Sequence, residues 1–153
     1  MSANDPTLTL DPSTMTVEEV TRFAAQSLWD KQARDIQILD VEELVGYTDF
    51  LIIASARNER HVQALSNHLE RQMRDLKLRS LSRDPVRNRR WVVSDYGDFV
   101  VHIFVVEERE LYDLEGLWHE ADRLDFIPKG APAAPLGGAR PLTPSIALAD
   151  DEG

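Results

Sequence analysis

Residues 91–104 have the sequence WVVSDYGDFVVHIF, in which two apolar runs flank the polar turn Asp95-Tyr96-Gly97-Asp98. Apolar side chains occupy both alternating sets of positions along Phe99–Val106, so this segment predicts a strand that is covered on both faces. Gly97 supplies the positive φ that a tight hairpin requires. We therefore expect strands over residues 91–95 and 99–106 that pair antiparallel.

Hydrophobic periodicity outside the hairpin predicts five further elements. Apolar residues recur every three or four positions over residues 16–33 and 58–78, which indicates helices, and a weaker helical pattern covers 111–124. Thr16 with Glu19 forms a capping box, and Asn58 suits an N-cap. Residues 35–41 and 50–54 have the pattern of strands. A hairpin combined with a helical crossover predicts an α/β fold, a single small domain with a mixed sheet flanked by helices.

The two ends of the chain lack this periodicity. We expect residues 1–15 to form a flexible leader, residues 16–127 the folded domain, and residues 128–153 a disordered tail rich in Pro, Gly and Ala. The chain has no cysteine, which excludes disulfides and thiolate chemistry. No apolar run approaches the roughly 18 residues of a membrane span. We expect a cytoplasmic protein without membrane contacts.

Charge is distributed unevenly along the chain, whose net charge is −10. Residues 71–90, from Arg71 to Arg90, hold eight Lys and Arg against two acids, whereas residues 91–127 hold ten acids against two Arg. Each segment is explained either as a solvated face or as a surface for a partner of opposite charge. The basic segment lacks the interleaved aromatic residues of a platform for single-stranded nucleic acid.

Catalysis is the principal alternative for the opening segment. Asp95 and Asp98 could serve a metal-dependent, nucleotidyltransferase-like enzyme, but polar residues around a glycine are also typical of any hairpin tip. No glycine-rich phosphate loop and no pair of histidines with metal-binding spacing occurs in the sequence. We therefore expect neither an enzyme, a cofactor nor a metal. Tyr112 and Trp118 have the character of interface anchors, although core packing explains them equally well.

Five segments, in this order and spacing, resemble the ribosomal silencing factor family, also called Iojap-like. They are Asp35–Val41, Thr48–Ala54, Arg60–Val62, Trp91–Ile103 and Tyr112–Trp118. The resemblance covers about residues 16–122. It implies nucleotidyltransferase-like topology without an active site. The chain departs from the family at SLSRDPVRNRRW, residues 80–91, where relatives often carry a Gly-rich stretch.

The resemblance also implies a function. Members of this family bind ribosomal protein fourteen of the large ribosomal subunit, block association with the small subunit, and so lower translation when nutrients are scarce. A peripheral contact of Arg71 to Arg90 with rRNA and a homodimer off the ribosome are compatible with that role. The partner-binding residues that the resemblance assigns to this chain are Trp91, Asp95, Tyr96, Asp98, His102, Tyr112, Leu114, Leu117 and Trp118.

Overall fold

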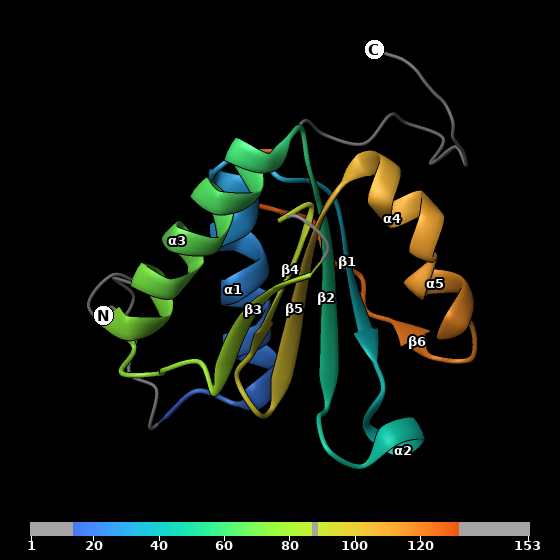
Figure 1. Cartoon of the computed structure of the whole chain (residues 1–153). Coiled ribbons are helices and arrows are strands. Elements are labelled where there is room, and N and C mark those ends of the chain that lie inside the picture. Colours follow the sequence, from blue (N-terminus) through green and yellow to red (C-terminus); the bar gives the residue numbers. More distant parts are fainter. Residues whose placement is uncertain (1–13, 87–88, 132–153) are drawn as a thin grey trace.

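The computed structural model describes residues 14–86 and 89–131 (Figure 1). One six-stranded sheet has the order β3-β4-β5-β2-β1-β6. Strand β5 pairs parallel with β2 and antiparallel with β4, so the predicted mixed sheet is confirmed. The strands are β1 (Arg34–Asp40), β2 (Phe50–Ala56), β3 (Ser82–Val86), β4 (Trp91–Asp95), β5 (Phe99–Val105) and β6 (Asp122–Arg123).

Helices lie on both sides of this sheet. The long helices α1 (Val17–Asp30) and α3 (Glu59–Asp75) lie together on one side, and the short helices α4 (Val106–Tyr112) and α5 (Leu114–Leu117) lie on the other (Figure 1). A single turn, α2 (Glu42–Val45), interrupts the β1–β2 connection and ends at Gly46 in a left-handed conformation. The prediction of a sheet flanked by helices is therefore confirmed.

Both long helices begin at the residues that the sequence indicated. The Glu19 amide donates to Thr16 Oγ1 (3.1 Å) and the Thr16 amide donates to Glu19 Oε1 (2.8 Å), which completes the capping box. The His61 amide donates to Asn58 Oδ1 (2.8 Å) at the start of α3. These side chains satisfy amides that have no partner within their own helix.

His61 links three segments at the start of α3. Its ring Nδ1 accepts from the Arg57 amide (3.0 Å), and its Nε2 lies 2.8 Å from the Lys31 carbonyl oxygen in the α1–β1 connection. Because Nδ1 accepts, Nε2 is the nitrogen that donates to the Lys31 carbonyl oxygen. This geometry agrees with a structural role for His61, because a metal ligand would need one of these nitrogens free.

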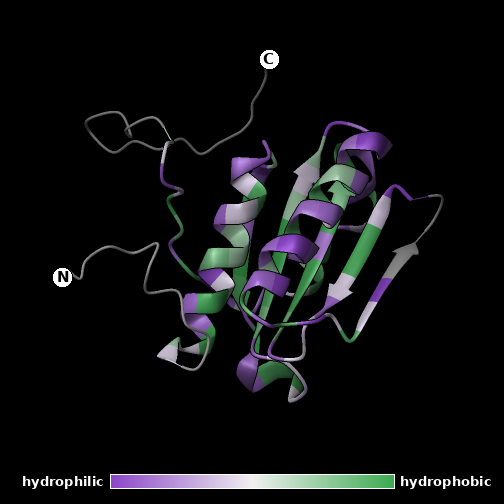
Figure 2. Ribbon diagram, turned by 90° about the vertical axis from the view of Figure 1, so that its left-hand side faces the viewer, coloured by the Kyte–Doolittle hydropathy of each residue, from purple (hydrophilic) through white to green (hydrophobic). Residues whose placement is uncertain are grey.

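Strand β2 is buried along its whole length because both faces are packed. Ile52 and Ala54 contribute to the main core beneath α1 and α3. Leu51 and Ile53 contribute to a second, smaller cluster on the opposite face. Hydrophilic residues dominate the outward side of the helices (Figure 2), so the apolar stripes of α1 and α3 point at the sheet.

Three sequence predictions were wrong in detail. Strand β3 contains Asp84 and Pro85, where the sequence predicted no strand. It is an edge strand, where Pro85 does not interrupt a ladder on both sides. The second hairpin strand ends at Val105, and Val106 begins α4. The single helix expected over 111–124 is broken at Asp113, whose φ of +49° is left-handed, and the segment ends in β6.

The predicted ends of the chain lie mostly outside the described residues. Only Thr14 and Met15 of the expected leader, and residues 128–131 of the expected tail, are described. The domain limits 16–127 therefore stay a prediction. Within the described ranges, no helix combines the length and the apolar character that crossing a membrane requires.

The N-cap of α3 gives a direct test of this fold. Asn58→Ala should lower the free energy of unfolding by about 1 kcal/mol, because the amides at the start of α3 lose their side-chain acceptor. Urea denaturation at neutral pH measures the change. The control Gln63→Ala, at an exposed position of the same helix, should change stability by less than half as much; equal losses would contradict the capping role.

Candidate functional site: a half-covered aromatic face

The face of the sheet opposite α1 and α3 is only partly covered by α4 and α5; we call it the aromatic face. On β4 and β5 its residues Trp91, Val93 and His102 are half-buried, whereas Val92 and Ile103, which point to the other face, are buried. The buried floor and the half-buried residues packed on it are Leu39, Val41, Leu51, Ile53, Val100, Phe104, Val45, Trp91, Val93, Tyr112, Leu114, Trp118 and Ala121.

Trp91 is the centre of an aromatic cluster on this face. Its ring lies 4.8 Å from Phe104 and 4.8 Å from Tyr112, between ring centroids, and 5.9 Å from His102. Phe104 and His102 come from β5, and Tyr112 comes from the last turn of α4. The cluster therefore joins the hairpin to α4, at separations that are favourable for aromatic pairs.

His102 is held in its neutral form. Trp91 Nε1 donates a hydrogen bond to His102 Nδ1 (3.1 Å), so the ring proton lies on Nε2. Burial lowers the pKa of His102 to about 4. Protonation of Nδ1 would also set two N–H donors against each other, which opposes the charged form further. His102 is therefore an uncharged member of the aromatic face near neutral pH.

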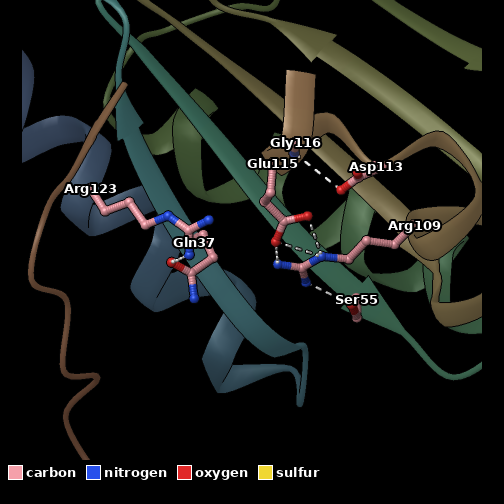
Figure 3. Close-up of polar contacts among 7 residues, drawn as sticks. All are labelled: Gln37, Ser55, Arg109, Asp113, Glu115, Gly116 and Arg123. Atoms are coloured by element: carbon pink, nitrogen blue, oxygen red, sulfur yellow. Dashed lines mark hydrogen bonds and ion pairs between the residues drawn. The ribbon is translucent and has the colours of Figure 1, made fainter. Parts of the chain in front are cut away.

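A buried ion pair fixes α5 against α4 and the sheet (Figure 3). Arg109 on α4 is buried; its Nη1 donates to Ser55 Oγ on β2 (2.7 Å), and its Nε and Nη2 donate to the Glu115 carboxylate on α5. The guanidinium thus contacts both neighbours through a planar fork that lysine cannot reproduce. It aligns two helices that are too short to be stable alone.

The break between α4 and α5 is built from Asp113 and Gly116. Asp113 Oδ1 accepts from the Gly116 amide (3.1 Å) and thereby caps α5 (Figure 3). A Cβ on residue 116 would lie 2.2 Å from Asp113 Oδ2, so a side chain there would displace the cap. The turn places Trp118 against the second cluster and leaves Leu117 67% exposed.

The two aspartates of the hairpin tip belong to the turn. Asp95 Oδ1 accepts from the Gly97 amide (2.8 Å), and Gly97 has φ +86°, so the expected glycine geometry is confirmed. The Asp98 carbonyl oxygen accepts from the Asp49 amide (2.9 Å) and so ties the tip to the start of β2. In residues 14–86 and 89–131 no group of three or more His, Asp or Glu side chains is arranged to hold a metal ion.

Tyr96 lies apart from the other residues that the sequence singled out. Its ring stacks on Phe99 (5.1 Å between centroids) and packs against the main core on the α1 side of the sheet. Burial, reinforced by the Glu70 carboxylate, raises the pKa of Tyr96 to about 12. The structure therefore brings together Trp91, His102, Tyr112, Leu114 and Trp118, with Leu117 beside them, but not Tyr96.

This fold and this residue pattern match one family of proteins. Residues 14–139 match the family model described as "Ribosomal silencing factor during starvation". The chain belongs to the ribosomal silencing factor family. A crystal structure of a Chromobacterium violaceum protein has the same fold, with a TM-score of 0.66 and 28% identity, covering 73% of this chain and 92% of that one.

Relatives of the family occur in bacteria and in organelles. The ribosomal silencing factor RsfS of Bacillus subtilis is 32% identical over 112 residues, which cover 73% of this chain and 95% of the relative. A mouse protein named mitochondrial assembly of ribosomal large subunit protein 1 is 34% identical over 94 residues, which cover 60% of this chain and 41% of the relative. The expected family resemblance is therefore confirmed, and the name of the family is that of a silencing factor rather than an enzyme.

Sequence reasoning missed Arg109, which holds α4 and α5 against the sheet, and the exposure of Leu111. Leu111 is 69% exposed on α4, and its spacing from Leu114 suggested a core helix position instead. Arg109 is one of only two Arg in the acidic segment 91–127. Its position among ten acids was a signal that it pairs with one of them.

Breaking the Arg109 pair should loosen this face. Glu115→Ala leaves the buried guanidinium with only Ser55 as a partner, so the free energy of unfolding should fall by about 1–3 kcal/mol. Urea denaturation followed by Trp fluorescence reports the change. Glu110→Ala removes an exposed carboxylate of α4 and should change stability by less than 0.5 kcal/mol; a Glu115 variant as stable as wild type would contradict the anchoring role.

The histidine predicts a pH dependence. The unfolded chain binds a proton on His102 below about pH 6.5, whereas the folded protein binds it only near pH 4, so folding stability contributed by the neutral ring is present above pH 6.5 and is lost as pH falls towards 4. Between pH 7 and 5 wild type should therefore lose about 1–2 kcal/mol more than His102→Asn.

Urea denaturation at both pH values measures this difference. His119→Asn removes an exposed histidine and is the matched control, which should retain the pH dependence of wild type. A His102 variant with the same loss as wild type would refute the assignment.

Proposed function

We propose that this protein binds the large ribosomal subunit through ribosomal protein fourteen and sterically prevents the small subunit from joining. The mechanism needs no chemical step. A bound domain only has to remain where the second subunit would make contact. The exposed apolar part of the aromatic face, next to rigid half-buried aromatic residues, is the observation that supports this role.

The aromatic face has the composition of a protein interface. Trp91, Tyr112 and Trp118 are half-buried, so their side chains are held in place while part of each ring remains accessible. Leu111 on α4 and Leu117 on α5, the two helices that cover this face, are 69% and 67% exposed. Fixed aromatic anchors with a few exposed aliphatic neighbours are typical of the residues that contribute most to binding.

Acidic side chains lie near these apolar residues. Glu110, Asp113 and Glu120 are all exposed, and they lie on or next to α4 and α5, the helices that cover the aromatic face. A rim of one charge sign raises the association rate with a partner of opposite sign and selects against other partners. The partner should therefore present basic residues around an apolar centre, as expected of a ribosomal protein.

The names of the relatives point to the same target. The Bacillus subtilis relative is named a ribosomal silencing factor, and the mouse relative is named for assembly of the ribosomal large subunit. We propose that this chain shares the large subunit as its partner. A homodimer through the aromatic face would cover the same residues and would compete with docking on the ribosome.

Leu117 provides the sharpest test of the docking face. Leu117→Asp should weaken binding to purified large subunits at least tenfold, because it places a charge at the centre of the contact, while the exposed position leaves the fold intact. Co-sedimentation with large and small subunits separately measures binding. Subunit joining, measured by sucrose-gradient centrifugation, should be inhibited by wild type and not by this variant.

The matched control is Ile127→Asp, which introduces the same charge at a residue that is 82% exposed and outside the aromatic face. It should bind and inhibit like wild type. Normal binding by a folded Leu117→Asp protein would remove the aromatic face from the proposal. Unimpaired subunit joining in the presence of saturating wild-type protein would remove the function itself.

A further inference from the structure

The basic segment 71–90 does not form one continuous patch. Arg83 donates to Glu70 Oε1 and Asn67 Oδ1 on α3 and is half-buried. Arg90 donates to Glu108 Oε2 (2.7 Å) and lies within 4.0 Å of two further carboxylates, Glu59 and Glu107. These two arginines connect β3 and the β3–β4 turn to the neighbouring helices. The positive charges of Arg83 and Arg90 are therefore paired with carboxylates of the same chain.

Other arginines form a line along the exposed side of α3. Arg60, Arg71 and Arg74 are exposed and follow each other at intervals of eleven and three residues, which brings them within about 60° of one another around the helix. They extend over roughly 21 Å, at 1.5 Å per residue. No ion pair involves these three residues in the described part of the chain. We call this line the arginine stripe.

A groove lies beside Arg60, along the N-terminal half of α3. It has a volume of about 450 Å³ and is lined by Glu59, Arg60, Gln63, Ala64, Asn67 and Arg89. The exposed Arg89 therefore adds a cation from the β3–β4 connection, outside α3. The small Ala64 keeps the groove open, and the amides of Gln63 and Asn67 are groups that bind phosphate and ribose oxygens. The exposed carboxylate of Asp75 lies at the C-terminal end of the stripe, next to Arg74.

We propose that the arginine stripe and its groove bind the phosphate backbone of an RNA duplex. Four arginines aligned with amide groups fit a row of phosphates, since guanidinium groups bind phosphate oxygens in pairs. None of the groove and stripe residues is aromatic, so the surface lacks the stacking platform that unpaired bases need. Duplex RNA, which proteins contact mostly through phosphates and 2′-hydroxyls, is the form that fits.

The position of the stripe complements the proposed docking face. Helix α3 lies on the opposite side of the sheet from α4 and α5 (Figure 1), so a protein partner on the aromatic face and an RNA backbone on α3 can be bound together. The choice of RNA as the source of phosphates rests on the proposed function, because the large subunit carries duplex rRNA. The acids bordering the aromatic face should keep RNA away from that side.

Direct binding to a duplex tests this inference. The full chain is titrated into a fluorescein-labelled RNA duplex of 20 base pairs at 50 and 200 mM KCl, and anisotropy is recorded. Wild type should bind at 50 mM, and its affinity should fall steeply with salt. The variant Arg60→Gln/Arg71→Gln/Arg74→Gln should bind at least tenfold more weakly, with a log–log salt slope smaller by roughly one per arginine removed.

A matched control removes the same amount of charge elsewhere. Arg34→Gln/Arg123→Gln/Lys129→Gln changes three exposed cations that lie neither on α3 nor among the residues that line the groove, and it should bind the duplex within twofold of wild type. Glutamine is a good helix former, so the α3 variant should stay folded, as circular dichroism will show. Leu117→Asp should bind the duplex normally, which separates failure of this surface from failure of the aromatic face.

Three results would overturn the proposal. The first is no duplex binding at 50 mM KCl up to 100 µM protein, and the second is an unchanged affinity and salt slope in the α3 variant. The third is competition by single-stranded RNA or a polyglutamate peptide as strong as by unlabelled duplex. In that case the stripe would respond to negative charge in general rather than to a duplex backbone.

Discussion

Parallel pairing of β2 with β5 requires the chain to cross from one end of the sheet to the other, and the remaining architecture follows from that crossover. Seven residue pairs join the two strands, from Phe50 opposite Phe99 to Ala56 opposite Val105. The connection between them contains α3, which packs beside α1 over one face and buries it. Only the short segment after β5 is left to cover the other face. Incomplete cover on that face is therefore a consequence of topology rather than of a local defect in packing.

Short helices can cover a sheet only if something other than their own hydrogen bonds holds them. Helix α5 has four residues and α4 has seven, both below the length at which a helix is stable in water. Arg109 supplies the missing constraint, since it contacts β2 through Ser55 and α5 through Glu115. Trp91 supplies a second one through its ring contacts with Tyr112. These contacts hold in place the helix α5 that carries the exposed Leu117. A residue held in this way loses little conformational entropy when a partner binds.

Charge is distributed unevenly over the fold. Some of the cations near β3 form ion pairs within the fold, and others lie on the exposed side of α3. The acids of residues 91–127 lie mostly on the hairpin tip and along α4 and α5, while α1 and α3 carry further carboxylates. A net charge of −10 therefore conceals two surfaces of opposite character. Two such surfaces suit two chemically different partners, which agrees with a family named for silencing ribosomes.

The strongly periodic elements were predictable from the sequence: both long helices, their caps at Thr16 and Asn58, and the hairpin around Gly97 rest on local patterns that the tertiary structure preserves. The family was predictable too, because its motifs are contiguous segments. Strand β3 and the break at Asp113 were not, since an edge strand and a four-residue helix depend on contacts with distant residues. Alternation shows which side chains of a strand share a face, but not which face a crossover will bury. The tertiary structure therefore decided that Trp91, His102 and Tyr112 meet on a half-covered face while Tyr96 joins the core.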